Sequence, residues 1–369
     1  MPNKESLYRK YRPFQLEDIV GQRHVVATLK QASINQSFSH AYLFSGNHGC
    51  GKTSMARILA NLMECENPVN GKLCGKCRAC QTIHCGVASD VIEIDGASNS
   101  GVDNIKNIID AAQWSPQELK RKIYIIDEVH RLTTAAVSAL LKILEEPPSY
   151  LSFILCTTEI DKILKTSLSR CQKFNFSKIL SKDITGRLSI IAKQENINIE
   201  NDALFLIAKM ARGSMRDAIG YLEQIGTVAG NKTITSDNAQ KYFGLADRQG
   251  ILNIVKAIIE SNIMLILDQV NDLIMASVEP KEILDEISEV FRSAMIINAQ
   301  DGETKLIDLP DSEIQEIKKI SSGLTMAQLL KLAKLFASIE VDKKQTFNIN
   351  DRWIMEATLI NCVEFLRTK

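Results

Sequence analysis

Short apolar runs alternate with longer segments of helical period over the first half of the chain. The apolar runs, which predict strands, cover residues 41–45, 91–95, 123–127, 153–157 and 172–176. The third run is continuous rather than alternating, which is typical of a strand buried on both faces. Segments of helical period lie between the strands, for example over residues 53–63, 102–113 and 134–144. Strands that alternate with helices predict βαβ units and a parallel sheet, and therefore an α/β fold.

The pattern changes after residue 178, where the strand signals stop. Residues 180–243 predict several helices with a break over 211–214, and residues 247–369 predict longer amphipathic helices. The last helix is expected over residues 351–366 with Asp351 as its N-cap. The residues predicted to lie near one face of that helix are Ile354, Ala357, Val363 and Leu366. Residues 300–316 carry six acidic groups and one lysine, which predicts an exposed linker.

Composition changes this picture little but excludes several classes of protein. Of the 369 residues, 45% are apolar and 24% charged, which is enough for a buried core and excludes extensive disorder. The sequence contains no run of about 18 uncharged apolar residues, so no membrane span is predicted. The first residues also lack the apolar stretch of a signal peptide, so a cytoplasmic protein is expected.

Charge is balanced overall and uneven along the chain. The 44 basic and 44 acidic side chains divide into 22 and 17 over residues 1–178, a net +5, and 22 and 27 over the rest, a net −5. A bulk nucleic-acid binder is usually more basic than this. A modest positive surface on the first part and chance segregation of charge both explain the numbers.

Residues 46–53 match the phosphate-loop pattern G-x-x-x-x-G-K-[ST] in full. The segment follows a predicted strand and opens a predicted helix, which is the context that the pattern requires. Glycines let backbone N–H groups surround phosphate oxygens, and the helix N-terminus adds positive potential. Lys52 is expected to reach the β- and γ-phosphates and Thr53 to bind Mg²⁺; the alternative is a glycine-rich turn. The residues expected to hold the nucleotide here are Gly46, Asn47, His48, Gly49, Cys50, Gly51, Lys52, Thr53 and Ser54.

The predicted strand 123–127 ends in two carboxylates, Asp127 and Glu128. In parallel sheets ligands bind at the carboxyl ends of the strands, so these side chains are expected beside the phosphate loop. Asp127 is predicted to hold Mg²⁺ and Glu128 to polarise the attacking water; the alternative is an acidic turn without chemistry. The string continues to His130 and superficially resembles a DExH helicase box. A helicase of that type needs a second recA-like domain, which the helical remainder does not supply.

Nine cysteines in a chain expected in the cytoplasm argue against a disulfide framework. Four of them, Cys65, Cys74, Cys77 and Cys80, lie within 16 residues. Four thiolates at this spacing predict a closed, structural Zn²⁺ site, with free or redox thiols as the alternative. Cys85 is expected to be a bystander. Cys50 in the phosphate loop is expected to be a small filler, with oxidation sensing as the alternative.

Further motifs follow one another in a recognisable order. They are Arg9-Lys-Tyr-Arg-Pro13, Val20-Gly-Gln22, His40-Ala-Tyr-Leu-Phe-Ser-Gly46, the cysteine insert, Glu93-Ile-Asp95, Ala97-Ser-Asn99, Leu140-Leu-Lys-Ile-Leu-Glu-Glu-Pro-Pro148, Ser169-Arg-Cys171 and Gly213-Ser-Met-Arg-Asp217. Together with the phosphate loop they resemble the tau/gamma subunits of bacterial DNA polymerase III, the AAA+ ATPases of the sliding-clamp loader. The match is dense over residues 7–245 and thin over 247–369.

The resemblance implies roles for residues outside the phosphate loop. Tyr8, Arg12 and the segment at Val20 would surround the adenine and ribose. Thr157 or its neighbour Thr158 would be the first sensor of the γ-phosphate.

Two arginines complete the implied catalytic set. Arg216 would be the second sensor, on a helical lid. Arg170 would be an arginine finger that acts on ATP bound by the neighbouring subunit, and such a finger can be worth about 10³–10⁵ in rate. Without the resemblance, a surface salt bridge is the ordinary interpretation of Arg170.

The resemblance also implies the architecture and the function. The expected fold is an AAA+ phosphate-loop parallel-sheet domain over residues 1–178 with a zinc module at 65–80, a helical lid over 179–243 and a helical collar over 244–369. The expected function is that of an ATP-hydrolysing motor, which opens the sliding clamp and loads it onto primed DNA. This motor would be part of the DNA polymerase III holoenzyme, which as a complex is a nucleotidyltransferase. ATP, Mg²⁺ and Zn²⁺ are the expected cofactors. The expected partners are the delta and delta-prime subunits, further copies of this chain, the beta clamp and primer–template DNA, without a membrane.

Two rival functions have different chemistry. One is a non-hydrolysing scaffold like delta-prime, whose phosphate loop is degraded, whereas this loop is intact. The other is a different AAA+ DNA remodeller, such as a branch-migration motor, which lacks the zinc insert. Because the sequence ends at Lys369, it resembles the short gamma form rather than tau. Weak candidates for phosphate contacts to DNA are residues 98–102, Lys106 and Lys142.

Overall fold

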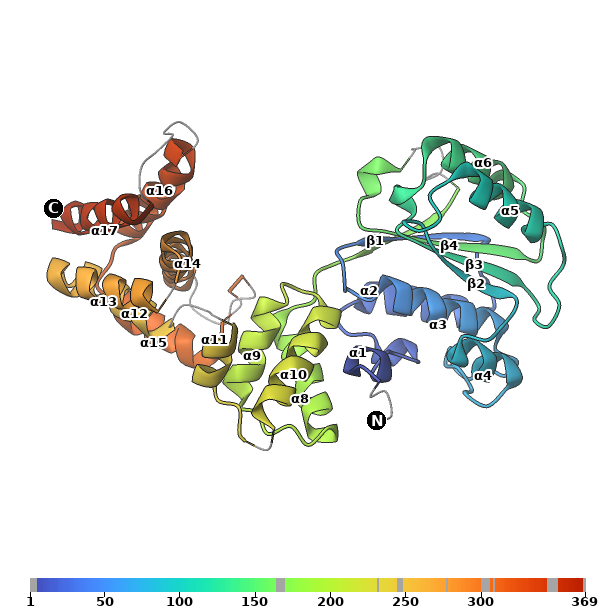
Figure 1. The fold of residues 1–369 in the computed structure, drawn as a ribbon, viewed down its shortest axis with the longest axis horizontal. Helices are drawn as coiled ribbons and strands as arrows, with labels where there is room; N and C mark the ends of the chain where they lie inside the picture. The colour runs from blue at the N-terminus through green and yellow to red at the C-terminus, as the bar shows by residue number, and fades with distance from the viewer. Residues whose placement is uncertain are drawn as a thin grey trace. The chain divides into compact units, whose positions relative to one another are not determined.

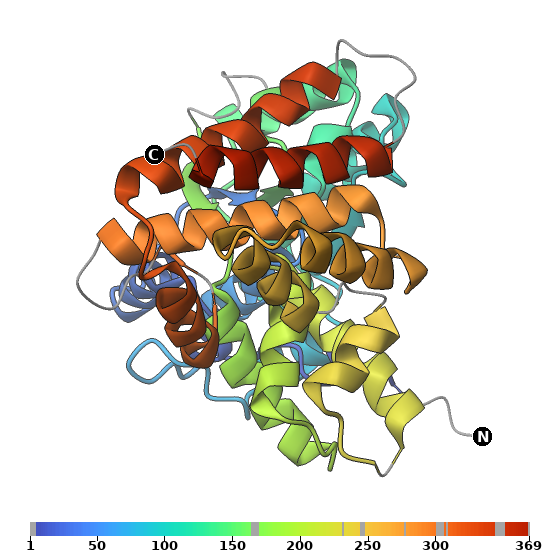
Figure 2. The same ribbon diagram turned by 90° about the vertical axis from the view of Figure 1, so that its left-hand side faces the viewer.

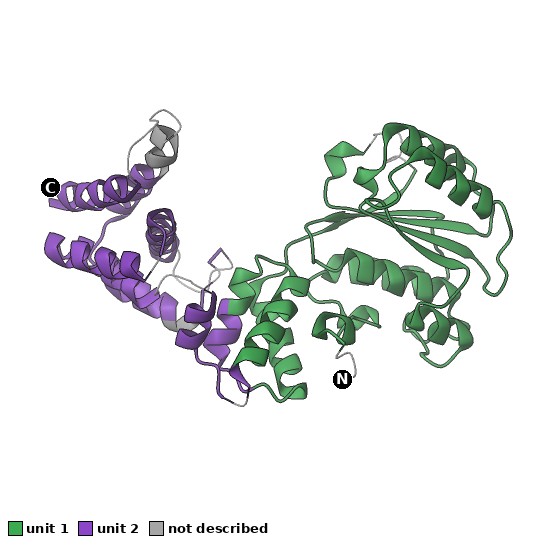
Figure 3. Ribbon diagram, in the orientation of Figure 1, with its two compact units in different colours: residues 1–197, 207–228 green, residues 198–206, 229–369 purple. Residues whose placement is uncertain are grey.

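The computed structural model describes residues 5–163, 170–230, 232–243, 248–276, 278–299, 306–307, 309–343 and 351–367. The chain forms two compact units (Figure 3). The first unit contains residues 1–197 and 207–228, and the second contains residues 198–206 and 229–369. The division into three domains, at 1–178, 179–243 and 244–369, remains a prediction.

A five-stranded parallel sheet forms the centre of the first unit (Figure 1). Its strands are β1 (Ala41–Gly46), β2 (Val91–Asp95), β3 (Lys122–Asp127), β4 (Leu151–Thr157) and β5 (Gln172–Phe176). They lie in the order β2-β3-β4-β1-β5, and every neighbouring pair is parallel. The predicted parallel sheet and its five strands are therefore confirmed. In the register, Ser45 of β1 lies opposite Thr157 of β4, so the carboxyl ends of these strands meet at one edge.

Helices cover both faces of this sheet (Figure 1). On one face α2 (Arg23–Ile34) and α3 (Lys52–Glu64) pack over the buried rings of Tyr42 and Phe44. On the other face α5 (Val102–Ala112) and α6 (Thr134–Glu145) pack over Leu43 and its neighbours. Because successive side chains of a strand point to opposite faces, a sheet covered twice needs continuous apolar strands.

Short helices lie before β1 and in the connections between strands, and longer helices follow the sheet. The short ones are α1 (Leu7–Lys10), η1 (Leu16–Asp18), α4 (Arg78–Cys85), η2 (Val129–Arg131) and η3 (Ile160–Lys162). The longer ones are α8 (Ser181–Gln194), α9 (Asn201–Met210), α10 (Met215–Ala229) and α11 (Ser236–Phe243). The predicted break over residues 211–214 separates α9 from α10 and contains Gly213 at φ +91°.

Two buried carboxylates hold the loop that precedes β3. Asp90 accepts hydrogen bonds from the backbone N–H groups of Gln117, Glu118 and Leu119 at 2.7–3.0 Å. Glu64 accepts one from the N–H of Lys120 at 2.8 Å. Backbone N–H groups outside regular structure need a partner, and here the two buried carboxylates supply it.

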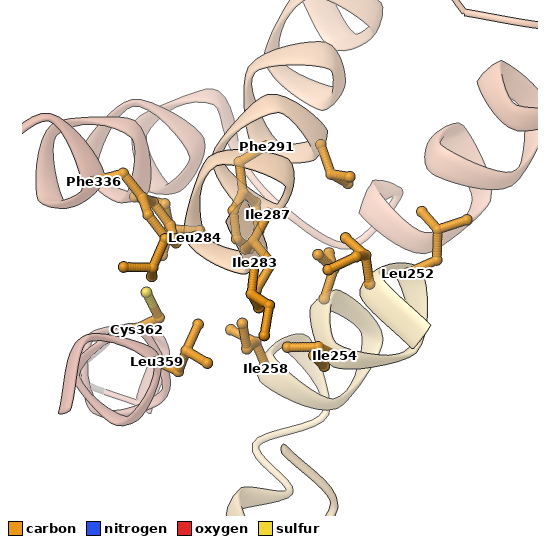
Figure 4. Close-up of a cluster of buried hydrophobic side chains, with 14 of the residues drawn as sticks. Leu252, Ile254, Ile258, Ile283, Leu284, Ile287, Phe291, Phe336, Leu359 and Cys362 are labelled. Atoms are coloured by element: carbon orange, nitrogen blue, oxygen red, sulfur yellow. The ribbon is translucent and has the colours of Figure 1, made fainter. Parts of the chain in front are cut away.

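The described part of the second unit contains helices and no named strand. Besides α11 and the first part of α9, these helices are α12 (Arg248–Ile259), α13 (Ile263–Met275), α14 (Pro280–Ala299), α15 (Asp311–Ser321), α16 (Met326–Lys343) and α17 (Asp351–Arg367). Helix α14 packs against α12, α15, α16 and α17, as Figure 2 shows from the side of this unit. Ile254, Ile258, Ile283, Ile287 and Leu359 meet in its apolar core (Figure 4).

The expectation of an exposed linker over residues 300–316 was wrong in part. Residues 311–316 form the first turns of α15 instead of an exposed linker, because Pro310 precedes the helix and Ile314 and Ile317 pack into the core. Ile307 and Leu309 are also buried, while residues 300–305 and 308 lie outside the described residues.

The predicted apolar face of the last helix is displaced. Its buried side chains are Met355, Thr358, Leu359, Cys362 and Val363, whereas Ala357 is exposed. Positions 355, 359 and 362 follow the 3.6-residue period, and the weakly apolar methionine and cysteine concealed this stripe. Asp351 is the first residue of α17 rather than its cap. In the described residues of both units, no helix is long and apolar enough to cross a membrane.

Candidate nucleotide-binding site

The loop between β1 and α3 has the backbone that a phosphate cradle needs. Gly46, Gly49 and Gly51 have φ values of +147°, +69° and +101°, a region that favours glycine. A Cβ on Gly46 would lie 2.4 Å from the carbonyl oxygen of Phe176 on β5, so only glycine fits there. Lys52 is the first residue of α3, and its Nζ donates to the carbonyls of Gly46 and Asn47 at 2.8 Å each. The predicted phosphate loop therefore folds into a closed turn over a helix N-terminus.

The first turn of α3 and the end of β3 bring a hydroxyl and two carboxylates together. Thr53 Oγ1 donates to Asp127 Oδ2 at 2.6 Å, although the two residues are 74 positions apart. Glu128 follows directly and has φ +49°, which is rare for a residue with a side chain. Such backbone strain is found where the surrounding structure fixes a functional side chain. Oxygen ligands of this kind suit Mg²⁺, so Thr53 and Asp127 fit a magnesium site.

Glu128 is held by contacts from two further segments. Its Oε2 accepts a hydrogen bond from Thr158 Oγ1 at 3.0 Å and lies 3.3 Å from His130 Nδ1. Its Oε1 lies 4.0 Å from Nδ1 of the exposed His48. Thr157, the predicted first sensor, is fully buried, and its Oγ1 lies 3.1 Å from His130 Nδ1. Thr158, the other candidate sensor, therefore contacts Glu128 directly and Thr157 contacts it through His130.

A cavity lies over this loop with an empty volume of about 930 Å³, its open mouth included. The predicted residues that line it are Tyr8, Arg12, Val20, His48, Gly49, Cys50, Gly51, Lys52, Thr53, Ser54, Asp127, Glu128 and Arg216. Gly46 and Asn47 do not line it and instead accept hydrogen bonds from Lys52. Residues from distant parts of the sequence thus meet in one cavity.

Arginines and an aromatic ring form the side of the cavity away from the carboxylates. The guanidinium carbon of Arg216 lies 5.0 Å from the centre of the Tyr8 ring, a cation–π distance. Burial lowers the pKa of Arg12, and the charge of Arg57 lowers it further. The exposed Arg216 and the Tyr8 ring together provide a stacking surface, and the partly buried Arg12 adds positive potential for an anionic ligand.

Several residues that shape the cavity were not predicted from the sequence. They are Tyr11, Pro13, Asp18, Ile19, Ile179, Arg187, Met215 and Ile219. The fully buried Gln22 fixes the Val20 segment, because its amide exchanges two hydrogen bonds with the backbone of Ser177 at 2.8 and 3.1 Å. Gln22, Tyr11, Pro13 and Met215 belong to motifs used for the resemblance, whereas the remaining residues carry no local signal.

Arg170 lies apart from this cavity. Its Nη2 is 2.7 Å from Glu145 Oε1 at the end of α6, and its side chain is one-third exposed. It is not among the described residues that line the cavity. Ser169, the first residue of its motif, lies outside the described residues.

The four predicted zinc ligands form a compact cluster. The Sγ atoms of Cys65, Cys74, Cys77 and Cys80 all lie within 4.8 Å of one another, and those of Cys74 and Cys80 are 3.9 Å apart. Tetrahedral zinc with bonds of about 2.3 Å requires sulfur–sulfur distances of about 3.8 Å. Backbone N–H groups donate to three of these sulfurs at 3.4 Å. The N–H groups of Lys76 and Cys77 lower the pKa of Cys74 to about 6. The cluster is therefore compatible with zinc.

The cluster is attached to the segment that precedes α2. Gln15 exchanges two hydrogen bonds with the backbone of Leu73 at 3.0 and 3.1 Å, and the ring of Phe14 meets His84 edge-on. Cys85 is exposed and lies outside the cluster. Cys50 is buried, and burial raises the pKa of its thiol, which favours its interpretation as a filler.

The proposed contacts to DNA receive no further support from side-chain geometry. Lys106 and Lys142 are both exposed, and Lys106 lies 3.8 Å from Asp103 of the same helix. Exposed lysines of this kind are common on any surface.

Three family models match successive parts of the chain. Residues 21–180 match the DNA polymerase III delta subunit, and residues 183–229 match the ATPase lid domain of a DNA polymerase III clamp loader subunit. Residues 234–344 match domain III of the DNA polymerase III subunits gamma and tau. The matches together reach from the sheet into the second unit.

Relatives with these names are similar over most of the chain. DNA polymerase III subunit tau of Bacillus subtilis is 41% identical over 298 residues, which are 81% of this chain and 53% of that protein. The chain thus spans about half the length of that relative. DNA polymerase III subunit gamma of Buchnera aphidicola is 32% identical over 361 residues, 98% of each chain. Among solved structures, the branch migration motor RuvB of Thermotoga maritima has a TM-score of 0.49 at 22% identity, over 68% of this chain and 80% of its own.

Proposed function

Because this chain belongs to the family of gamma and tau subunits of DNA polymerase III, we propose that it is an ATP-hydrolysing subunit of a clamp loader. In this proposal it opens a ring-shaped sliding clamp and loads it onto primed DNA, as part of a polymerase holoenzyme. The observation that carries the proposal is that Thr53, Asp127 and Glu128 line one cavity beside an intact phosphate loop. A non-hydrolysing scaffold would not need this set of residues.

The phosphate end of the cavity supplies the chemistry. Lys52 and the N–H groups of the loop bind the phosphates, and Thr53 and Asp127 hold Mg²⁺. When bound, Mg²⁺ neutralises charge on the phosphate oxygens. Glu128 accepts a hydrogen bond from the attacking water and aligns it with the γ-phosphate. This arrangement is supported by the exposure of Glu128 to the cavity.

The other end of the cavity recognises the nucleotide. Tyr8, Arg12 and Val20 surround adenine and ribose, with the Tyr8 ring already placed against the Arg216 guanidinium. Arg216 lies at the start of α10 and reports the γ-phosphate to the lid. Thr157 acts as first sensor through its contact with His130.

Arg170 serves ATP that is bound by a neighbouring subunit. Its partial exposure and its distance from the lining of its own cavity support a role in trans. An arginine supplied by a neighbour makes hydrolysis depend on assembly, because charge on the γ-phosphate oxygens is then stabilised only in the complex. The ion pair with Glu145 keeps the guanidinium in place until a neighbour binds.

The cysteine cluster holds a structural Zn²⁺ ion. Four thiolates leave no open position for a substrate, so the ion stabilises the module and takes no part in hydrolysis. The partners in this proposal are the delta and delta-prime subunits, further copies of this chain, the beta clamp and primer–template DNA.

Reconstitution of clamp loading tests the proposal. The full chain is assembled with its partner subunits and clamp, and ATP turnover is measured with and without primed DNA. Lys52→Ala is expected to abolish nucleotide binding, because it removes the cation that faces the phosphates. Arg170→Ala is expected to retain ATP affinity and to lose DNA-stimulated turnover by about 10³-fold or more.

The matched control is Arg78→Ala, which removes another surface arginine with a carboxylate partner, Glu118. It should leave stimulated turnover unchanged. Stimulated turnover that survives Arg170→Ala would refute the role in trans, and turnover that survives Lys52→Ala would refute the proposed ATPase.

A further inference from the structure

His130 lies at the carboxyl edge of the sheet and enters the function proposed above only through its contact with Thr157. It is the middle residue of η2, directly after β3, and its side chain is 2% exposed. Nδ1 lies 3.1 Å from Thr157 Oγ1 and 3.3 Å from Glu128 Oε2. The imidazole thus joins the end of β4 to the carboxylate that follows β3.

The two nitrogens of this ring are not equivalent. Nε2 lies 3.3 Å from Glu159 Oε1, but the geometry there is not that of a hydrogen bond, and Nε2 has no other partner among the described residues. Nδ1 has a hydrogen-bond partner in Thr157, whose Oγ1 also accepts from the N–H of Glu159 at 3.0 Å. The contacts that define the ring position are therefore those of Nδ1.

A proton on Nδ1 would make the contact of this nitrogen with Glu128 attractive. A lone pair on Nδ1 would face the carboxylate oxygen at 3.3 Å, which is repulsive. With the proton on Nδ1, the ring donates to Thr157 and presents positive charge density to Glu128. In this tautomer, which the inference takes as its premise, the imidazole is an attractive support for the carboxylate.

The carboxylate of Glu128 has two different sides. Oε2 receives Thr158 Oγ1 at 3.0 Å and faces His130, so it is occupied by the protein. Oε1 lies on the side of His48, and both residues line the cavity. We propose that His130 is a positioning residue that holds Oε2 of Glu128 and thereby points Oε1 at the water that attacks ATP. This inference rests on the proposed function.

The expected size of the effect follows from general-base catalysis. A positioned base contributes about 10²–10⁴ in rate, and a displacement of about 1 Å can cost about 10². Loss of the histidine leaves Thr158 as a second support for Glu128. We therefore expect a fall in kcat of about 10–100-fold without a change in ATP affinity.

A matched pair of amides separates the two ring nitrogens. In His130→Asn the side-chain amide lies near the position of Nδ1, and in His130→Gln it lies nearer that of Nε2. His130→Ala removes both. Each full-length variant is assembled with its partner subunits, and kcat, KM, affinity for a fluorescent ATP analogue and Tm are measured.

We expect His130→Asn to keep kcat within about threefold of the parent, and His130→Gln and His130→Ala to lose about 10–100-fold. Affinity for the analogue should stay within about twofold in all three. A normal kcat in His130→Ala would overturn the inference. Equal losses in the two amide variants, accompanied by a lower Tm and weaker binding, would also overturn it and indicate a structural role.

Glu128→Gln, measured in parallel, distinguishes this failure from that of the proposed function. If Glu128→Gln hydrolyses ATP as fast as the parent, the proposed hydrolysis mechanism fails and the role of His130 fails with it. If Glu128→Gln is inactive while His130→Ala is fully active, only the role of His130 is refuted.

Discussion

Buried polar side chains do different things in the two units. In the first unit they connect segments that are far apart in the sequence. Gln22 bonds to the backbone of Ser177, 155 residues away, and Asp90 bonds to three N–H groups of residues 117–119. Thr53 reaches Asp127 in the same way at the edge of the sheet.

In the second unit the buried hydroxyls that form hydrogen bonds stay within their own helices. Ser321 donates to the carbonyl of Ile317, and Thr358 to that of Ile354, each four residues earlier. Among the described residues, the partly buried Arg248 does connect different helices, since it pairs with carboxylates of both α14 and α15. Apolar packing otherwise accounts for this core (Figure 4).

The difference arises because the candidate nucleotide site is built from loop backbone, whereas the second unit is built from helices. A nucleotide site is made of loops, and their backbone N–H groups must find partners outside regular structure. Buried side chains provide those partners and fix the loops at the same time. Helices satisfy their own backbone, so a helical core needs only shape and apolar area. The first unit is therefore organised for positioning and the second for packing.

Removal of the proposed metal should affect the first unit most. Cys74→Ser combined with Cys77→Ser is expected to abolish zinc binding and unfold the module, because structural zinc contributes about 10–16 kcal/mol in isolated zinc-finger peptides. Zinc content by mass spectrometry and limited proteolysis of the module measure this. ATP affinity should be partly retained, since the phosphate loop lies outside the module.

Cys85→Ser is the matched control, because Cys85 is an exposed cysteine outside the cluster. It should keep one zinc per chain. A full zinc content in the double variant would rule out the proposed ligands.

A cavity in the second unit should reduce stability without touching the chemistry. Leu359→Ala removes a fully buried side chain and is expected to cost about 2–5 kcal/mol of unfolding free energy. Leu330→Ala makes the same change on a side chain that is 46% exposed, at a cost below about 0.5 kcal/mol. Denaturant unfolding and nucleotide titration compare the two. Weakened nucleotide binding in Leu359→Ala alone would contradict the separation of roles between the units.

The smallest expected effects concern the two carboxylates that hold residues 117–120. Burial alone would raise the pKa of Asp90, but the N–H groups of Glu118, Gln117 and Leu119 outweigh it and lower that pKa below the ordinary 3.8. Burial raises the pKa of Glu64 above the ordinary 4.5, against the N–H of Lys120. The two groups should therefore make stability depend on pH in opposite directions.

The contribution of Asp90 is present above pH 3.8 and is lost as the pH falls through its lowered pKa. The contribution of Glu64 is present below pH 4.5 and is lost as the pH rises through its raised pKa. Asp90→Asn should thus cost about 1–3 kcal/mol at pH 7 and less in acid. Glu64→Gln should gain relative to the parent between pH 4.5 and 7. Tm differences measured from well below pH 3.8 up to pH 7 record both effects, and equal slopes would contradict the assignment.

Much of the first unit could be predicted because its signals are local. The five strands, the phosphate loop and the four cysteines each lie within a few neighbouring residues. A glycine with positive φ or a pair of close thiols needs only its own segment to be recognisable. The same holds for the break over residues 211–214, where Gly213 interrupts the helical period.

The sequence by itself therefore determined the fold class, the phosphate loop and the set of clustered thiols. Only the tertiary structure decided that His130 faces Glu128, that Gln22 anchors the Val20 segment, and which face of α17 is buried. The physical reason is range. Backbone geometry is set by adjacent residues, whereas a contact between distant segments depends on how every intervening element packs.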